Sequence, residues 1–211
     1  MAELKLPKVY PITDPRLSGL SHSEQIGSLI EGGASLVQIR DKYASSKEFF
    51  EIVRECVEIQ DVRLIVNDRV DIAMMAGADG VHLGQDDLSP TEARKLLGPD
   101  AIIGFSTHTI EQAVAALELP VDYIAFGPIF PTTTKPDHDA VVGLGTLRKI
   151  RGRIGNFPLV GIGGINLENL AAVIDAGADS VAMISALVAD PSTIVKNMRK
   201  ALRLGENAQN R

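Results

Sequence analysis

The stretch IVNDRVDIAMMAGADGVHLGQDD, residues 65–87, has the pattern of a strand, a helix and a second strand, and the rest of the chain repeats that pattern. Its first strand ends at Asn67 and Asp68, and its second leads to Asp86 and Asp87. In a parallel β/α arrangement the carboxyl ends of the strands open on one face, so carboxylates from both strands converge there. Mg²⁺ is usually held by one or two carboxylates together with the phosphates of a substrate. The stretch therefore predicts a place where a magnesium-bound diphosphate could lie.

The repeat of this pattern indicates the fold. In three copies a helix ends at a glycine, as a left-handed C-cap favours, and a short apolar strand follows; a fourth has the strand alone. Gly33 and Gly77 are 44 residues apart and Gly77 and Gly177 are 100 apart, which fits about two and about four β/α units of roughly 25 residues. The copies are EGGASLVQIR (31–40), AGADGVHLGQ (76–85), AGADSVAMIS (176–185) and VDYIAFG (121–127), which lacks the glycine.

Further apolar runs bring the predicted strands to eight, with helices between them that begin at clear capping residues, as Ser21 with Glu24 and Ser45 with Glu48 do. Eight alternating units predict a closed (β/α)₈ TIM barrel. We expect a single domain over residues 1–211, with its core at about 8–204 and a frayed, disordered tail at 205–211. A doubly wound open sheet is the alternative, but the repeat is even and no GxGxxG follows the first strand. The further runs are KVYPIT (8–13), RLIVND (63–68), AIIGFS (101–106) and PLVGIGG (158–164).

Composition limits the classes of function. A chain of 211 residues with a net charge of −6 and a pI near 5.2 offers no broad basic surface for nucleic acid, so an anion site must be a local cluster. The single cysteine, Cys56, lies in a helical pattern and is expected to be a buried thiol rather than a nucleophile. No segment approaches about 20 apolar residues, and the N-terminal stretch has no apolar core of signal-peptide length. With no internal disulfide to form, the protein is predicted to be cytoplasmic.

Strand two of the predicted barrel carries two cations at its end. Gln38, Arg40 and Lys42 alternate onto one face of this strand, and Ile39 lies on the other. Arg40, as a planar fork, and Lys42, as a point charge, could together hold a diphosphate. The alternative is a solvated strand end with a surface ion pair through Asp41.

Strands three and four carry the acidic residues. Asp68 could bind a metal or simply cap the following helix. Asp86 and Asp87 have no evident structural duty, because Ser89 already caps the next helix, and this favours a metal site. His82 alternates toward the barrel interior, where we expect a hydrogen-bonded residue rather than a ligand.

Strands five and six lead to hydroxyl groups that suit a phosphate. Ser106 and Thr107 end strand five, and His108 after them is a candidate for substrate contact. The connection at 131–143 is long for a compact domain, so we expect it to be functional or disordered. Ordinary turns and a solvated flexible loop are the alternatives. The polar cluster in that connection is Thr132, Thr133, Thr134 and Lys135.

The GIGG turn at residues 161–164 suits a second anion. Its glycines let backbone N–H groups approach a phosphate, and we expect Asn166 to cap the helix that follows. The backbone of Ile184 and Ser185, at the end of strand eight, could close the same site. The loops after strands seven and eight are the usual phosphate site of this fold. A tight βα turn without a ligand is the alternative.

With these residues in place, the chain resembles the thiamine-phosphate synthase (thiamine-phosphate pyrophosphorylase) family over nearly its whole length, from about Val9 to Leu202. The order of the matching motifs along one barrel makes the resemblance specific. They are VQIRDK (37–42), IVND (65–68), GADGVHLGQDD (77–87), GFSTHT (104–109), GPIFPTTTK (127–135), GIGGI (161–165) and MIS (183–185).

The resemblance implies a transferase that joins a hydroxymethylpyrimidine diphosphate to a thiazole phosphate and releases diphosphate. By the same resemblance one Mg²⁺ per subunit would be bound by Asp68 and Asp87. Catalysis would depend on Arg40, Lys42, Lys135 and Ser106. The pyrimidine diphosphate would be held by Gln38, Ile39, Arg40, Asp41, Lys42, Asn67, Ser106 and Lys135. The thiazole phosphate would be held by Thr132, Thr133, Thr134, Gly164, Ile184 and Ser185.

A dissociative mechanism follows from the chemistry of these substrates. The amino-pyrimidine ring can stabilise a positive charge on its exocyclic methylene, so diphosphate is expected to leave before the thiazole nitrogen attacks, with CO₂ lost if the thiazole is carboxylated. The alternatives are a thiazole tautomerase on the same barrel, a silent thiamine-phosphate sensor, and a Schiff-base aldolase that uses Lys42 or Lys135. Partners are expected to be small phosphorylated molecules, with no nucleic acid and no membrane, and the chain could form a homo-oligomer.

Overall fold

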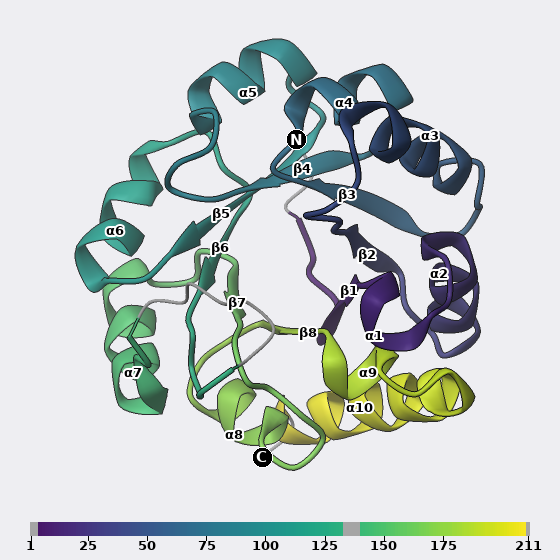
Figure 1. The fold of residues 1–211 in the computed structure, drawn as a ribbon. Helices are drawn as coiled ribbons and strands as arrows, with labels where there is room; N and C mark the ends of the chain where they lie inside the picture. Colours follow the sequence, from purple (N-terminus) through teal and green to yellow (C-terminus); the bar gives the residue numbers. More distant parts are fainter. Residues whose placement is uncertain (1–3, 133–139, 210–211) are drawn as a thin grey trace.

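The strands of this chain close into one parallel barrel, which confirms the predicted fold (Figure 1). The computed structural model describes residues 4–132 and 140–209. Each strand pairs in parallel with the next, and β8 pairs with β1 to close the ring. The strands are β1 (Val9–Thr13), β2 (Leu36–Ile39), β3 (Arg63–Asn67), β4 (Gly80–Leu83), β5 (Ile102–Thr107), β6 (Tyr123–Phe126), β7 (Leu159–Gly161) and β8 (Ser180–Met183).

Helices surround the barrel between successive strands (Figure 1). They are α1 (Pro15–Ser18), α2 (His22–Glu31), α3 (Ser46–Cys56), α4 (Val70–Ala76), α5 (Pro90–Leu97), α6 (Ile110–Ala115), α7 (Gly143–Ile154), α8 (Leu170–Asp175), α9 (Ser185–Val188) and α10 (Ile194–Gln209), with short 3₁₀ helices η1 (Ala116–Glu118) and η2 (Pro191–Thr193). None of these described helices is long and apolar enough to cross a membrane.

Alternation along the strands divides the apolar residues into two layers. Val37 and Ile39 of β2 face outward into the layer between barrel and helices, together with Cys56 of α3. Leu36 of β2 faces the barrel interior, and so does Tyr10 of β1. Burial raises the pKa of the Cys56 thiol to about 12, with a smaller contribution from Glu55, so the expectation of an inert buried thiol is confirmed.

An aspartate before each of three strands explains part of the sequence repeat. Its carboxylate accepts a backbone N–H from the first or second residue of the preceding strand, at the barrel's amino end. The contacts are Asp79 with the N–H of Leu64 at 2.7 Å, Asp122 with that of Ile103 at 2.7 Å, and Asp179 with that of Leu159 at 2.9 Å. The aspartates of the repeat thus join neighbouring strands and leave the opposite face for chemistry.

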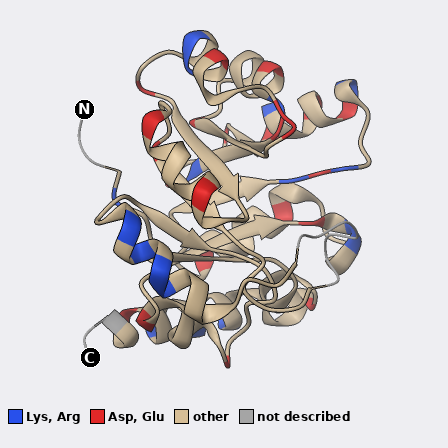
Figure 2. Cartoon of the chain, turned by 90° about the vertical axis from the view of Figure 1, so that its left-hand side faces the viewer, with Lys and Arg blue, Asp and Glu red and all other residues tan. Residues whose placement is uncertain are grey.

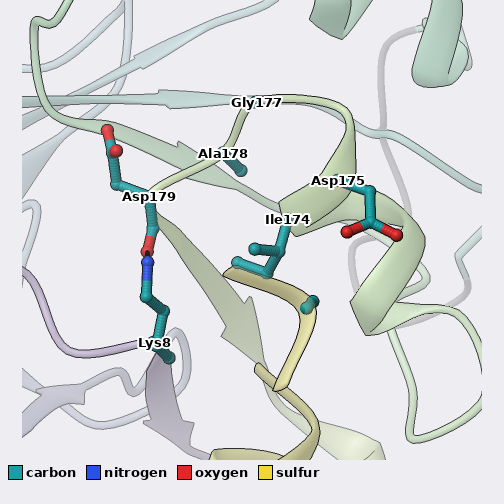
Figure 3. Close-up of a pocket in the computed structure, with 7 residues that line it drawn as sticks. Lys8, Ile174, Asp175, Gly177, Ala178 and Asp179 are labelled. Carbon is teal, nitrogen blue, oxygen red and sulfur yellow. Dashed lines mark hydrogen bonds between the residues drawn. The ribbon is translucent and has the colours of Figure 1, made fainter. Parts of the chain in front are cut away.

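A pocket of about 370 Å³ lies at this amino end of the barrel (Figure 3). Lys8, ahead of β1, and Asp179, ahead of β8, line it, and the Lys8 ammonium donates to the Asp179 carbonyl at 3.1 Å. None of the predicted site residues lines this pocket. In a β/α barrel this face contributes to stability, while the chemistry lies at the carboxyl ends of the strands.

Two predictions about element ends were wrong. Asn166 does not begin α8: its side chain accepts from the N–H groups of Glu168 and Asn169 in a turn, and Asn169 is the residue ahead of the helix. The predicted tail at residues 205–211 is helical as far as Gln209, because α10 keeps apolar residues on its inner face up to Ala208, which is 6% exposed. Residues 210 and 211 lie outside the described part of the chain.

The expected helix starts at Ser21 and Ser45 are confirmed. Each serine accepts from the backbone N–H three residues later, and Glu24 and Glu48 return the bond to the backbone of their serines.

Basic and acidic residues are interspersed over the outer helices on the side of the molecule shown in Figure 2.

Candidate active site

The end of β2 brings three of the predicted residues to the carboxyl-terminal rim of the barrel. Gln38 is 3% exposed and points inward, where its Nε2 donates to the Tyr10 hydroxyl at 3.2 Å. The Arg40 guanidinium lies 3.9 Å from the Asp14 carboxylate. Lys42 donates a hydrogen bond to Asp68 of the next β/α loop. Both cations are therefore held on the rim by carboxylates, at the face where this fold places its chemistry.

Two other predicted residues of this segment do not present side chains to the rim. Ile39 is fully buried in the outer layer, so it could meet a substrate only through its backbone. Asp41 folds back on its own loop, where its carboxylate accepts from the N–H groups of Tyr43 at 2.8 Å and Ala44 at 3.0 Å. The alternative of a surface ion pair through Asp41 is also wrong, because its carboxylate contacts the buried His22 ring at 3.5 Å.

His22 and Thr13, which were not predicted from the sequence, hold this loop from below. The Thr13 hydroxyl donates to the backbone carbonyl of Gln38 at 3.2 Å and lies 2.7 Å from His22 Nδ1. Burial lowers the pKa of His22, against the opposing charges of Asp41 and Asp14. These contacts tie the segment that carries Arg40 and Lys42 to β1 and α2, and a tertiary contact of this kind leaves no local sequence signal.

The acidic residues of β3 and β4 are brought together at the adjoining position. Asp68 has a left-handed backbone (φ 62°), and its N–H donates to the carbonyl of His82 at 2.8 Å. Burial raises the pKa of Asp87; its bond from the Gly84 N–H and the charge of Lys42 oppose this rise, and the nearby Asp68 carboxylate adds to it. Such a left-handed conformation is uncommon outside glycine and is often found at functional sites.

These contacts decide between the alternatives left open for the acidic residues. Asp68 does not cap α4, because that helix starts after Arg69 without a side-chain cap. Asp87 does have a structural duty, since its carboxylate accepts from the Gly84 N–H at 2.7 Å, whereas Asp86 is exposed. The expectation that neither residue has a structural role is therefore wrong for Asp87.

The donor set of Asp68 and Asp87 fits Mg²⁺. No group of three or more His, Cys, Asp or Glu side chains placed to hold a metal occurs within residues 4–132 and 140–209. Mg²⁺ needs fewer protein ligands than that, because it keeps waters and binds one or two carboxylates plus substrate phosphates. Two carboxylates close enough to raise the pKa of one of them are a site at which a divalent cation would relieve repulsion.

The interior below this rim contains a continuous set of polar groups. His82 Nε2 lies 2.8 Å from the Ser106 hydroxyl, and His82 Nδ1 lies 3.0 Å from the Tyr123 hydroxyl. Tyr123 in turn contacts the Tyr10 hydroxyl at 3.0 Å, which receives the bond from Gln38. The expectation that His82 is a hydrogen-bonded interior residue is confirmed. Both tyrosines were missed, although period-two alternation places them on the inner face of their strands.

The residues after β5 have different surroundings. Ser106 is half-buried at the rim, and the Gln85 amide donates to its backbone carbonyl at 2.6 Å. The Thr107 hydroxyl is buried and donates to the Ala125 carbonyl at 3.1 Å, so it is a structural group. His108 donates through Nδ1 to the Gly127 carbonyl at 2.7 Å, which orients its ring beside the β6 loop.

The glycine turn after β7 packs directly against the loop after β6. A Cβ on Gly164 would lie 2.4 Å from the Pro131 carbonyl oxygen, and one on Gly163 would lie 2.5 Å from Pro128 Cα. Both glycines also have positive φ, so no other residue fits here without strain. Thr132 follows Pro131 directly and therefore lies near this turn. Of the rest of the predicted cluster, Thr133, Thr134 and Lys135 lie outside the described residues.

The remaining predicted residues end their strands on the same rim. Asn67 is the last residue of β3 and is 8% exposed. Ile184 and Ser185 follow β8 directly, and Ser185 is exposed. The rim thus carries an acidic and cationic group over β2 to β4, and a group of glycine and hydroxyl residues over β6 to β8.

Comparison with known proteins agrees with this arrangement. A family model described as thiamine monophosphate synthase matches residues 9–187. A thiamine-phosphate synthase of Koribacter versatilis is 47% identical over 197 residues, covering 89% of this chain and 92% of that protein. The one from Chloroflexus aurantiacus is 46% identical over 203 residues, covering 92% of each.

Solved structures show the same relationship. A thiamine phosphate pyrophosphorylase from Pyrococcus furiosus superposes with a TM-score of 0.83 at 36% identity, covering 95% of this chain and 96% of that one. A structure described as native KDPGal, at 16% identity and a TM-score of 0.74, shares the fold alone. Because the family match spans nearly all of the barrel and the relatives are identical at almost half of their positions, this chain belongs to the thiamine-phosphate synthase family, whose enzymes are transferases of thiamine biosynthesis.

Proposed function

We propose that this chain joins 4-amino-2-methyl-5-(diphosphooxymethyl)pyrimidine to a thiazole phosphate, giving thiamine phosphate and diphosphate. One observation carries the proposal: Asp68 and Asp87 meet at the ends of adjoining strands, with Lys42 bonded to Asp68 and Arg40 on the same rim. Two carboxylates beside two cations suit a diphosphate that carries a divalent cation, and a site for an uncharged ligand has no need of either pair.

The residues of the chain would act mainly on the leaving group. Bound at Asp68 and Asp87, Mg²⁺ would supply Lewis-acid neutralisation of the diphosphate charge. Arg40 and Lys42, held in place by Asp14 and Asp68, would stabilise the negative charge that grows on the diphosphate as its bond to the pyrimidine methylene breaks. The Ser106 hydroxyl, half-buried on β5, would donate to the same diphosphate.

The pyrimidine carbocation left behind would be attacked by the thiazole nitrogen. Gln38 and Asn67, at the ends of β2 and β3, would bind the pyrimidine, and positioning of the two reactants would supply much of the acceleration. If the thiazole carries a carboxyl group, CO₂ leaves with the joining. No nucleophilic side chain is required, which agrees with the buried state of Cys56.

The second anion site would hold the thiazole phosphate. Gly164 provides backbone without a side chain against the Pro131 carbonyl, and Thr132 and Ser185 offer hydroxyl groups on the same side of the rim. Roles for Thr133, Thr134 and Lys135 stay predictions from the sequence. A cytoplasmic location and a homo-oligomeric state likewise stay predictions.

The alternatives are disfavoured by particular contacts. A thiazole tautomerase has no use for the acidic pair beside Arg40 and Lys42. A sensor of thiamine phosphate needs no metal site. A Schiff-base aldolase needs a desolvated, neutral lysine, but Lys42 is exposed and bonded to a carboxylate.

A single assay separates these activities. Purified protein is mixed with the pyrimidine diphosphate, the thiazole phosphate and Mg²⁺, and thiamine phosphate and diphosphate are measured by chromatography. Equal amounts of both products, abolished by EDTA and restored by added Mg²⁺, are the expected result. Tautomerised thiazole without coupling would favour the isomerase, binding without turnover would favour the sensor, and either result would overturn the proposal.

A further inference from the structure

The buried polar groups of the barrel interior form one unbroken hydrogen-bond chain from β2 to β5. Its members are Gln38, Tyr10, Tyr123, His82 and Ser106, and we call it the interior hydrogen-bond chain. The successive distances are 3.2, 3.0, 3.0 and 2.8 Å. It spans strands as far apart in sequence as β1 and β6, and it connects two residues that the proposed function places at the pyrimidine diphosphate.

Counting hydrogen atoms gives the direction of donation along the interior hydrogen-bond chain. Each tyrosine hydroxyl has one hydrogen to donate. Tyr10 receives the amide N–H of Gln38, so its own hydrogen can go only to Tyr123. Tyr123 must then donate to Nδ1 of His82, which places the ring hydrogen on Nε2, facing Ser106. Ser106 accepts that hydrogen, and its own hydrogen is left to point out of the chain.

The opposite direction would leave a buried donor without a partner. If Ser106 donated to His82, the ring would donate to Tyr123 and Tyr123 to Tyr10, and the Tyr10 hydrogen would then face only the amide N–H of Gln38. Tyr10 is 1% exposed, and an unsatisfied buried donor costs about 1–3 kcal/mol. The forward direction is therefore favoured by a population ratio of about 5- to 150-fold.

Gly104 provides independent evidence for the interior hydrogen-bond chain, because only glycine at this position leaves room for its side chains. A Cβ on Gly104 would lie 2.3 Å from the Tyr123 hydroxyl and 2.5 Å from His82 Nδ1. Any side chain at this position of β5 would therefore push apart the hydrogen bond in the middle of the chain. The φ of Gly104 does not require glycine, so the requirement arises from the space that the two rings occupy.

Ring packing and burial hold the chain in one state. The His82 ring stacks on Tyr123 with centroids 5.5 Å apart, and Tyr10 meets Tyr123 edge to face at 5.9 Å. Burial raises the pKa values of Tyr10 and Tyr123. Both hydroxyl groups therefore keep their hydrogens near pH 7, so Nδ1 of His82 remains the acceptor and the direction of donation does not change there.

We propose that Tyr10, Tyr123 and His82 are positioning residues that present the Ser106 hydroxyl as a hydrogen-bond donor toward the leaving diphosphate. This inference rests on the proposed function, because it assigns the acceptor of the Ser106 hydrogen to that substrate. A donor oriented before the reaction stabilises developing negative charge without reorganisation during the step. The interior hydrogen-bond chain also links Gln38 to Ser106. The hydrogen positions of these two substrate contacts are therefore set together.

The first test is direct and needs no substrate. The ¹⁵N chemical shifts of a histidine ring distinguish the Nε2–H tautomer, the Nδ1–H tautomer and the imidazolium. Among the four histidines of the chain, His82 is assigned from the signals lost in His82→Gln. We expect the neutral Nε2–H tautomer at pH 7. The Nδ1–H tautomer in the wild-type protein would contradict the direction of donation inferred for the interior hydrogen-bond chain.

The second test is a double-mutant cycle of Tyr123→Phe and Ser106→Ala, measured as kcat for thiamine phosphate formation. Tyr123→Phe should lower kcat about three- to tenfold, as expected for one net hydrogen bond, with little change in KM. In the Ser106→Ala background it should have no further effect. Tyr43→Phe, which removes the same hydroxyl from a ring that is 68% exposed, is the matched control and should match the wild type. Equal losses in both backgrounds would show a merely structural role and would overturn the proposal.

Variants of His82 extend the cycle. His82→Leu should lower kcat as much as Ser106→Ala does, and His82→Gln, whose amide can still donate to Ser106, should recover part of the activity. Melting temperatures are compared throughout, so that a loss of fold is recognised. If the wild-type protein forms no thiamine phosphate, the proposed reaction fails, and the ring shifts of His82 then decide on the interior hydrogen-bond chain alone.

Discussion

Replacing Asp87 by asparagine tests the acidic pair through two effects of opposite sign. The asparagine Oδ1 can still accept from the Gly84 N–H, which Asp87 accepts at 2.7 Å, so the local turn is kept. The main electrostatic effect of the substitution is the loss of one negative charge beside Asp68. In the absence of metal it should therefore relieve repulsion, and in its presence it should remove a ligand.

The size of the first effect follows from the partial exposure of the pair. Two unit charges in near contact repel by about 1 kcal/mol in water and about 4 kcal/mol at an effective dielectric constant of 20. Asp87 is half-buried and Lys42 is bonded to Asp68, so screening places the expected value near the lower limit, at about 1 kcal/mol. For a chain of this size that corresponds to a rise of about 2–4 °C in melting temperature.

The sign of this stability change agrees with the direction in which the pKa of Asp87 is shifted. Burial and the Asp68 carboxylate raise the pKa of Asp87 in the folded protein. A raised pKa favours folding below the unfolded-state pKa, and this contribution is lost as the pH rises through the folded-state value. At neutral pH the charged Asp87 therefore costs stability, and Asp87→Asn should stabilise the metal-free protein there.

Activity should change in the opposite direction. Loss of one group that neutralises a developing charge typically lowers kcat by about 10²–10³-fold, or about 2.7–4 kcal/mol. The assay is thiamine phosphate formation with saturating substrates and Mg²⁺, with thermal unfolding in EDTA measured in parallel. Asp86→Asn, the same change on the exposed neighbouring residue, is the control and should alter neither quantity appreciably.

Two results would refute this reasoning. If Asp87→Asn and Asp86→Asn have the same activity, Asp87 is not a metal ligand. If Asp87→Asn in EDTA melts several degrees below the wild type, the carboxylate is a net stabilising group, and the repulsion argument is wrong.

The remaining predictions concern metal affinity and the amino end of the barrel. Because protons compete with Mg²⁺ for Asp87, whose pKa is raised by burial and by Asp68, calorimetry with diphosphate present should show weaker Mg²⁺ binding as the pH falls toward that pKa, and an affinity independent of pH would contradict the site. Arg151→Met should lower the free energy of unfolding by about 1–3 kcal/mol, because Arg151 donates to the carbonyls of Gly177 and Phe157 and to Asp179. Arg153→Met, at an exposed position of the same helix, is the control in urea unfolding, and equal losses for the two variants would count against this role.

Local signals in the sequence were sufficient for the barrel. Apolar runs at regular spacing and a glycine after each of several helices report backbone preferences that do not depend on distant residues, and they predicted all of the strands. The capping boxes at Ser21 and Ser45 formed for the same reason. The acidic pair was also predictable, because parallel strands must end on one face.

Local signals failed at two element ends. Asn166 has the type of residue and the place of a helix cap, but its side chain accepts from the N–H groups of Glu168 and Asn169 in a turn, and α8 starts only at Leu170. Residues 205–209 have a polar composition, but burial of Ala208 keeps them helical. A competing local turn in the first case and a contact with another segment in the second override a weak local preference.

The amino-acid sequence by itself determined the barrel, the rim on which its polar groups gather and the family to which it belongs, because each depends on spacing along the chain. Only the tertiary structure decided which rim groups are held by others. His22 meets Asp41, and Tyr10 meets Tyr123 across 113 residues of sequence. Closure of the barrel creates these contacts, and their hydrogen-bond directions follow from how many donors and acceptors one buried volume must satisfy.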